Sequence, residues 1–327
     1  MTDTLEHFFT LTPDRVLEAV ERAGLVTTGL CYALNSLENR VYEVELDDGS
    51  RVVAKFYRPS RWGQDAILDE HRILDALVEH EIPAVAPIRF ADGDSLHATD
   101  DGIFFALFPR MGGRAPDDLG AQELEELGRV LGRMHNIMAS LDLPHRPVLS
   151  PATYGLESLA TILERASMPN GTRERYRDAV EGLVAVSEPL FAGRTDCVVH
   201  ADFHRGNLLR RPEGWLVLDF DDSAIGPPSQ DLWLVLPGRP SECREELDGF
   251  LRGYELFREF DHTSLRAIEA LRGLRYVRYA AWIARRWEDP SFKRAFPDWG
   301  SERYWESQVA DLYEQIRLVQ ASAQPYL

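Results

Sequence analysis

Three side chains with oxygen donors are clustered in one stretch of the sequence. Asp202 and Asn207 lie five positions apart inside "VVHADFHRGNLL", and Asp219 follows the apolar run "WLVL" twelve residues after Asn207. Carboxylate and amide oxygens are ligands that Mg²⁺ prefers, and a carboxylate can also orient and deprotonate an attacking hydroxyl. The spacing therefore favours phosphoryl transfer from a nucleotide, with Asp202 as the base and with Asn207 and Asp219 as metal ligands.

Such a transfer also needs a cation on the phosphates, and Lys55 is the candidate. It lies at the end of the apolar run "RVVAKF", where a lysine is unusual unless it is paired. Glu70 lies on the apolar face of the next expected helix and can supply that partner. The alternative is that Lys55 extends from the strand end to water while Glu70 is a solvated helix residue.

The polar loop residues also have an ordinary structural interpretation. Asp202 and Asn207 could simply cap their own turn. Asp221 and Asp222 crowd the same strand end as Asp219, so any of these acids could be the metal ligand. Asp219 is preferred because it directly follows the apolar run.

Other polar residues are expected to have structural roles. Asp231, in "GPPSQDLW", is expected to position the loop around Asp202 by accepting backbone hydrogen bonds. The segment "RGLRYVRYAAWIARRW" carries five arginines, which could form an anion site. At helical spacing, however, we expect these arginines to form a solvated face with the Tyr and Trp side chains turned inward.

Length and charge bound the class of protein. A chain of 327 residues suits two lobes, or one large domain with insertions. Asp and Glu outnumber Lys and Arg by 54 to 36, and the net charge of −18 argues against broad binding to nucleic acid or to anionic membranes. A cationic substrate or a basic protein partner is easier to accommodate. No basic leader and no run of about 18 apolar residues is present, so we expect a cytoplasmic protein that contacts no membrane.

The elements that must position these residues fall into a strand-rich front and a helix-rich back. Thr12 and Pro13 begin a short helix, and the runs at 40–46 and 51–57 form a hairpin around Asp48 and Gly49. The apolar spacing then predicts a helix over 64–78. Further strands are expected at 84–90 and 102–108.

The back of the chain begins after a connector at 108–116, where glycines and prolines interrupt both periodicities. We therefore expect an ATP-binding lobe over 1–110 and a mostly helical lobe, with the catalytic and metal-binding loops, over 111–327. A long amphipathic helix follows the connector, and several more are expected after Ser241. Short strands at 197–200, 207–210 and 214–220 carry the polar loops.

Several segments resemble a known enzyme family. "HADFHRGNLL" and "LDFDD" are similar to the catalytic and metal loops of the aminoglycoside phosphotransferase and choline kinase superfamily, which is related to the protein kinases. "VVAKFYRPSRW", "LNSLENRVYEV", "DEHRIL", "LGRMH" and "GPPSQDLW" resemble a bacterial cytoplasmic Ser/Thr protein kinase group of that superfamily, which acts in stress responses. The resemblance covers about residues 25–287. It implies an α+β, bilobal protein-kinase-like fold with an antiparallel-sheet N-lobe and a helical C-lobe.

The resemblance also implies roles for individual residues. Asp202 matches the catalytic aspartate, Asn207 matches its Mg²⁺ ligand, and Asp219 matches the second active-site acid, which also binds Mg²⁺. Lys55 with Glu70 matches the ion pair that anchors the phosphates of ATP.

The sequence departs from the family pattern at two places near these residues. Ala201 stands where glycine is commoner, which we expect to be harmless, and the first hairpin contains no GxGxxG motif. Ser36, in "SLENR", matches a serine in the loop over the ATP phosphates. Its hydroxyl and the neighbouring backbone N–H groups could hold the phosphates in place of that motif.

We therefore expect an ATP- and Mg²⁺-dependent serine/threonine protein kinase that acts as a monomer on a protein substrate in a stress response. The alternative acceptor is a small molecule, such as an aminoglycoside, choline, homoserine or a sugar. A third hypothesis is a nucleotide-binding module without catalysis.

Overall fold

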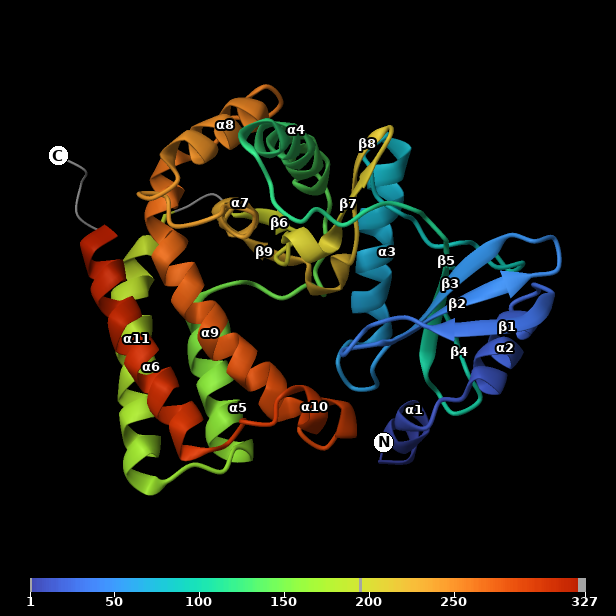
Figure 1. Ribbon diagram of the computed structural model, residues 1–327, viewed down its shortest axis with the longest axis horizontal. Helices are drawn as coiled ribbons and strands as arrows, with labels where there is room; N and C mark the ends of the chain where they lie inside the picture. The colour runs from blue at the N-terminus through green and yellow to red at the C-terminus, as the bar shows by residue number, and fades with distance from the viewer. Residues whose placement is uncertain (1, 194–195, 323–327) are drawn as a thin grey trace.

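The computed structural model describes residues 2–193 and 196–322. Figure 1 shows a twisted sheet at one end of the molecule and a group of helices at the other, with helix α3 (Gln64–Glu79) between them. The strands of the large sheet all precede residue 110. The predicted α+β class, with a sheet first and helices second, is confirmed.

The large sheet is antiparallel and has the strand order β1-β2-β3-β5-β4. The hairpin between β2 and β3 turns at Gly49, whose φ of +80° suits glycine. Side chains alternate between the two faces, so Ala54 and Phe56 enter one core while Lys55 points to the opposite face. The strands are β1 (Thr27–Ala33), β2 (Arg40–Leu46), β3 (Arg51–Phe56), β4 (His97–Ala98) and β5 (Phe104–Pro109).

Two N-terminal helices cover the face of the sheet that turns away from Lys55. They are α1 (Thr2–Phe9) and α2 (Pro13–Arg22), and Phe8, Val16 and Val20 are buried in the same core as the strands. Pro13 occupies the first turn of α2, as the sequence predicts. This face is therefore closed by the chain itself, which leaves the Lys55 face for a site.

The prediction of a strand at 84–90 is wrong. The segment has no regular secondary structure and makes one backbone hydrogen bond to β5, from Ile88 N to Leu107 O at 2.7 Å. Pro83 and Pro87 lack the N–H groups that a ladder requires. The edge of the sheet is instead the short strand β4.

The C-terminal part consists of helices that pack closely. Helices α4 and α8 approach so tightly that a Cβ built on Gly253 would lie 2.0 Å from Glu125 O, and one on Gly128 would lie 2.1 Å from Phe250 O. Only glycine permits this backbone contact. The helices are α4 (Ala121–Met138), α5 (Glu157–Arg165), α6 (Asn170–Phe191), α7 (Ser229–Trp233), α8 (Arg244–Glu255), α9 (Ile268–Arg285), α10 (Pro290–Ala295) and α11 (Glu302–Ser322).

Two small two-stranded sheets hold the polar loops. The first pairs β6 (Cys197–Val199) with β9 (Ala224–Gly226), and the second pairs β7 (Leu208–Arg211) with β8 (Gly214–Val217). The loop with Asp202 joins β6 to β7, and the loop with Asp219 joins β8 to β9, so the pairing brings the two loops together. Among the described residues, no helix is long and apolar enough to cross a membrane.

Candidate active site

Asp202 lies in a hydrogen-bond network that includes Asn207 and two further side chains. Asn207 Nδ2 donates to the backbone oxygen of Asp202 at 3.0 Å and to its Oδ2 at 3.2 Å. His204 Nε2 lies 3.2 Å from the same Oδ2, and Arg275 Nη2 of α9 donates to Oδ1 at 2.7 Å. The five-residue spacing therefore places Asn207 against Asp202, while the contact with Arg275 was not predicted.

Asp231 fixes the backbone just before Asp202, as the sequence predicts. The buried carboxylate of Asp231 accepts hydrogen bonds of 2.7 Å from the backbone N–H groups of His200 and Ala201. His135 Nε2 lies 3.0 Å from the same carboxylate. Ala201 has φ of +65°, the left-handed conformation that favours glycine, which explains why glycine is commoner at this position.

Asp219 follows the end of β8 and lines one cleft together with Asp202. Its φ of +61° is left-handed, a conformation that a short polar side chain tolerates. Leu218 N donates to Asn207 O at 2.9 Å, which ties the loop of Asp219 to the loop of Asp202. The side chain of Asp219 is 54% exposed, and its Oδ1 lies 3.6 Å from Lys55 Nζ.

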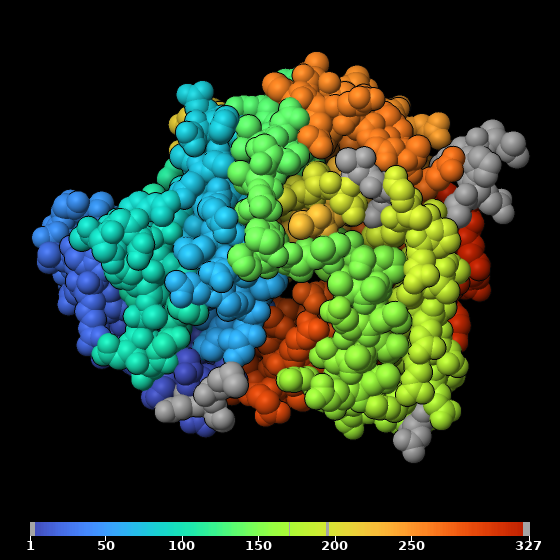
Figure 2. Space-filling model, turned by 180° about the vertical axis from the view of Figure 1, so that it is seen from behind, coloured from blue at the N-terminus to red at the C-terminus, as the bar shows by residue number. Residues whose placement is uncertain are grey.

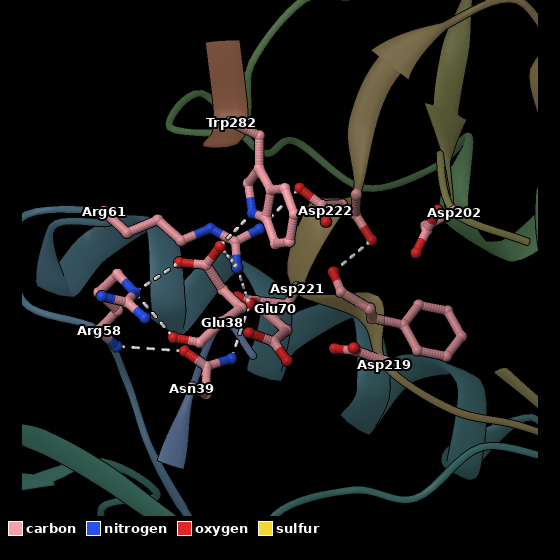
Figure 3. Close-up of polar contacts among 12 residues, drawn as sticks. Glu38, Asn39, Arg58, Arg61, Glu70, Asp202, Asp219, Asp221, Asp222 and Trp282 are labelled. Carbon is pink, nitrogen blue, oxygen red and sulfur yellow. Dashed lines mark hydrogen bonds and ion pairs between the residues drawn. The ribbon is translucent and has the colours of Figure 1, made fainter. Parts of the chain in front are cut away.

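The neighbouring acids already have partners, which favours Asp219 as the metal ligand. Asp221 Oδ2 accepts from Asn39 Nδ2 at 2.9 Å and from Arg61 Nη1 at 2.5 Å, whereas its Oδ1 is buried without a hydrogen-bond partner among the described residues. Asp222 Oδ1 accepts from Arg61 Nη2 at 2.7 Å. Figure 3 shows Arg61 reaching from the N-terminal part to this acidic turn.

Lys55 and Glu70 form the buried ion pair that the sequence predicts. Lys55 Nζ lies 2.9 Å from Glu70 Oε1, and both side chains are almost fully covered. Burial lowers the pKa of Lys55, but the carboxylates of Asp221, Glu70 and Asp219 outweigh this effect and hold that pKa well above its ordinary value. Lys55 is therefore a permanent cation that points to Asp219.

Ser36 lies in the loop between β1 and β2, at the edge of the cleft. Its Oγ accepts a hydrogen bond from the backbone N–H of Asn39 at 3.3 Å, so the hydroxyl braces the loop from inside. Ser36 and Asp219 line the same cleft. Among the described residues, no hydrogen bond joins their side chains.

Glu38 of this loop is a residue that the sequence interpretation missed. It forms ion pairs with Arg58 at 3.2 Å and with Arg286 at 2.8 Å, and Trp282 Nε1 donates to it (Figure 3). Arg286 and Trp282 belong to the end of α9, almost 250 residues away in sequence. The loop near Ser36 is therefore anchored to the C-terminal part by side chains whose proximity no local pattern indicates.

The prediction of a solvated arginine face on α9 is wrong. Arg275, Arg278, Arg285 and Tyr279 line a cleft of about 1110 Å³ that also contains Asp202 and Asp219. Tyr279 is 48% exposed there rather than turned into the core. The helical spacing correctly places the arginines on one face, but that face looks into the cleft rather than out to bulk solvent.

The donors in this cleft fit a magnesium ion that is bound together with a nucleotide. Asn207 donates through Nδ2 and leaves its Oδ1 unused within the described ranges, while Asp219 offers a half-exposed carboxylate. Residues 2–193 and 196–322 contain no group of three or more His, Cys, Asp or Glu side chains that forms a complete metal site. Mg²⁺ is usually held by one or two protein carboxylates together with waters and phosphates, so a sparse set of hard oxygen donors is suitable.

The two candidate catalytic acids have opposite electrostatic environments. Burial opposes ionisation of Asp202, but the contacts with His204 and Arg275 lower its pKa well below the ordinary range. Enclosure in the cleft, with Asp221 and Asp222 close by, raises the pKa of Asp219, although Lys55 opposes the rise. Asp219 is thus a carboxylate that a bound cation would stabilise in its ionised form.

Comparison with protein families gives one match that covers most of the chain. Residues 33–268 match the phosphotransferase enzyme family, APH. This range contains every candidate residue of the predicted site, from Ser36 to Asp219.

Curated relatives match over nearly the full length. Stress response kinase A of Escherichia coli strain K12 is 39% identical over 324 residues, which cover 98% of this chain and 97% of the relative. Serine/threonine protein kinase RdoA of Salmonella typhimurium strain LT2 is 38% identical over 323 residues, with coverage of 98% and 97%.

Solved structures of similar fold are more distant in sequence. An amicoumacin kinase in complex with AMP-PNP and Ca²⁺ has a TM-score of 0.71 at 21% identity, over 95% of each chain. A microcompartment-associated aminopropanol kinase has a TM-score of 0.67 at 18% identity, over 93% of this chain and 96% of the other. The kinase-like fold is therefore shared across proteins whose sequences differ widely.

Proposed function

Because the chain belongs to the phosphotransferase enzyme family, and within it to the stress response kinase A group, we propose that it transfers the γ-phosphate of ATP to serine or threonine in proteins. The relative from Salmonella typhimurium, at 38% identity, is named a serine/threonine protein kinase, whereas the amicoumacin kinase and the aminopropanol kinase are 21% and 18% identical. The sequence relationship thus favours a protein acceptor.

The observation that carries the proposal is that a buried ion pair and a hydrogen-bonded pair of acid and amide meet at Asp219. Lys55 with Glu70 comes from the N-terminal part, and Asp202 with Asn207 comes from the C-terminal part. Asp219 lies next to both, at 3.6 Å from Lys55 and on the loop hydrogen-bonded to Asn207. Phosphoryl transfer needs a phosphate-binding cation, metal ligands and a hydroxyl-orienting carboxylate, and these residues provide each of them.

The chemistry is mainly positioning and neutralisation of charge. Asp202 orients the acceptor hydroxyl and accepts its proton. Lys55, braced by Glu70, binds the α- and β-phosphates, while the Ser36 loop covers them. Asn207 and Asp219 would hold Mg²⁺, which supplies positive charge at the phosphate oxygens.

We further propose that residues 1–110 act as the ATP-binding lobe and 111–327 as the catalytic lobe of a cytoplasmic monomer. Residues from both parts line the cleft. The arrangement supports catalysis over passive nucleotide binding, because a nucleotide-binding module has no use for Asp202.

A phosphate-transfer assay with γ-labelled ATP and Mg²⁺ tests the acceptor class. The protein is offered a panel of proteins and, separately, aminoglycosides, choline, homoserine and sugars, with the Asp202→Asn variant as the control. We expect label on serine or threonine of a protein, and its loss in the variant. Label on small molecules alone would favour the alternative acceptor class, and no transfer to any acceptor would favour the non-catalytic module.

A further inference from the structure

The arginines of the cleft fall into two classes that differ in their partners. Arg58, Arg61 and Arg286 are buried and bound to the carboxylates of Asp289, Asp221 and Glu38, respectively. Arg278 and Arg285 also line the cleft, yet no carboxylate of the described residues lies within 4.0 Å of either. Unpaired guanidinium groups in a substrate cleft are available to a ligand.

The direct contacts that these two arginines make are with neutral groups. Arg285 Nη2 donates to the neutral hydroxyl of Thr161 at 3.0 Å, and the guanidinium of Arg278 stacks 5.0 Å from the ring centre of Tyr154. Burial lowers the pKa of Arg285, and the nearby charges of Arg278 and Arg165 lower it further, while the charge of Glu157 partly opposes the shift. An anion bound between these side chains would relieve that repulsion.

This local charge contrasts with the rest of the molecule. The chain has a net charge of −18, whereas the sequence of α9, "IEALRGLRYVRYAAWIAR", contains four arginines and a single acid. Arg275, Arg278 and Arg285 form a basic wall along one side of the cleft, whose lining elsewhere includes acids such as Glu164 and Glu288. A negatively charged ligand is therefore attracted to the side of the cleft that α9 forms.

The basic wall of Arg275, Arg278 and Arg285 begins next to Asp202, the candidate catalytic residue. Arg275, which donates to Asp202, lies three residues before Arg278 and ten before Arg285 on the same helix. At a rise of about 1.5 Å per residue, the wall extends about 15 Å along the helix axis from Arg275 to Arg285. An extended peptide covers that length in about five residues. The distance therefore fits a segment of protein substrate rather than one small molecule.

We propose that Arg278 and Arg285 bind carboxylate side chains of the protein substrate, so that the enzyme prefers serine or threonine with Asp or Glu within about five positions. This inference rests on the proposed function, because it requires a protein acceptor. The planar guanidinium groups suit bidentate binding of carboxylates, and the exposed ring of Tyr279 offers an apolar surface between them.

The test compares three acceptor sequences fused to one inert carrier protein, identical except that the residues around the acceptor serine are Glu, Gln or Lys. The full-length enzyme phosphorylates each with γ-labelled ATP and Mg²⁺. We expect kcat/KM for the Glu sequence to exceed that for the Gln sequence by about tenfold, and the preference to fall with added KCl.

Variants then show whether this preference comes from the two arginines. In Arg278→Gln/Arg285→Gln, the preference should fall to within about twofold, while the KM for ATP and the rate with the Gln sequence stay unchanged. Arg285→Lys should retain part of the preference, because it keeps the charge. Arg244→Gln, which removes an exposed arginine of α8 away from the cleft, should retain all of it.

The outcomes separate this inference from the proposed function. Equal phosphorylation of all three sequences, or a preference that survives in the double variant with an unchanged melting temperature, would overturn the inference and leave the protein kinase proposal in place. Transfer to none of the fusions, together with transfer to a small alcohol, would overturn both.

Discussion

Arg275 Nη2 donates a 2.7 Å hydrogen bond to Asp202 Oδ1, although the two residues are 73 positions apart in the sequence. The side chains are partly exposed, at 36% for Arg275 and 21% for Asp202, so the pair lies at the wall of the cleft rather than in the core. It holds the carboxylate ionised and fixes which oxygen faces the cleft. An acceptor hydroxyl that approaches Asp202 must therefore pass close to Arg275.

The first prediction concerns the removal of this contact. Arg275→Gln should lower kcat/KM for the acceptor by about tenfold to a hundredfold, because Asp202 loses a group that orients it. The free energy of unfolding should change by less than about 1 kcal/mol, since partly exposed ion pairs contribute little. Steady-state kinetics and urea unfolding measure both effects.

The matched control is Arg272→Gln, which removes an arginine one turn away on α9 that does not contact Asp202. Its ATP and acceptor kinetics should match those of the wild type. An Arg275→Gln enzyme with wild-type kcat/KM would contradict the positioning role of Arg275.

The second prediction concerns the buried pair of Lys55 and Glu70. Lys55→Met should destabilise the protein by about 3 kcal/mol, because it leaves the buried Glu70 carboxylate without its partner. In Lys55→Met/Glu70→Leu, most of that stability should return, while phosphate transfer stays lost because the cation for the phosphates is missing. Urea unfolding combined with the transfer assay separates the two effects.

An exposed ion pair provides the comparison. Arg317→Met removes the partner of Glu314 on the surface of α11, and should leave both stability and transfer nearly unchanged. If the double variant regained transfer activity, Lys55 would have no role in binding ATP.

The third prediction concerns Asp231, which acts on Asp202 through the backbone. Asp231→Asn loses one of the two carboxylate oxygens that accept from His200 and Ala201 at 2.7 Å. We expect a loss of about 2 kcal/mol in unfolding free energy, because a buried hydrogen-bonded charge is replaced and one N–H group loses its acceptor. The kcat should fall while the KM for ATP changes little, since Lys55 on β3 and Glu70 on α3 are untouched.

Thermal unfolding and steady-state kinetics of the same preparation check this prediction. A stable Asp231→Asn enzyme with full kcat would show that the loop holds its conformation without the carboxylate.

The fourth prediction concerns the pH dependence of stability. His71 is buried between Tyr57 and Ser95, with contacts of 3.0 and 2.8 Å, and burial together with the charges of Lys55 and Arg89 lowers its pKa to about 3. The unfolded histidine has a pKa of about 6.5, so acid favours the unfolded chain. The contribution of neutral His71 is complete above pH 6.5 and is lost progressively toward pH 3.

Between pH 7 and pH 5, this site should reduce the unfolding free energy by about 2 kcal/mol. His71→Gln removes the titration, so its stability should fall less steeply over that interval. His80→Gln, at an exposed histidine just beyond the same helix, should keep the wild-type dependence. Identical pH profiles for the wild type and His71→Gln would contradict a buried neutral histidine.

Local patterns in the sequence predicted the elements that carry the site. The hairpin around Gly49, the buried pair of Lys55 and Glu70, and the short strands beside Asp202 each have a signal within a few residues. The prediction of a strand at 84–90 failed because Pro87, and Pro83 just before the segment, remove ladder donors, which outweighs the preference of the apolar residues for a strand.

Contacts between distant segments were not predictable in this way. Glu38 meets Arg286, and Asp202 meets Arg275, through packing of α9 against two loops that lie far away in the sequence. The periodicity of α9 identifies a face that carries arginines, but it does not tell whether that face looks to solvent or into a cleft. The direction depends on the whole arrangement of the helical part.

The most direct test of the central claim is the rate of a single turnover in Asp202→Asn, measured with enzyme in excess over γ-labelled ATP and with Mg²⁺ and a protein acceptor present. The substitution keeps the size of the side chain but removes its charge and its ability to accept the proton. We predict that ATP binding changes by less than about threefold, while transfer slows by about a thousandfold. Transfer at close to the wild-type rate would contradict the assignment of this loop as the catalytic centre.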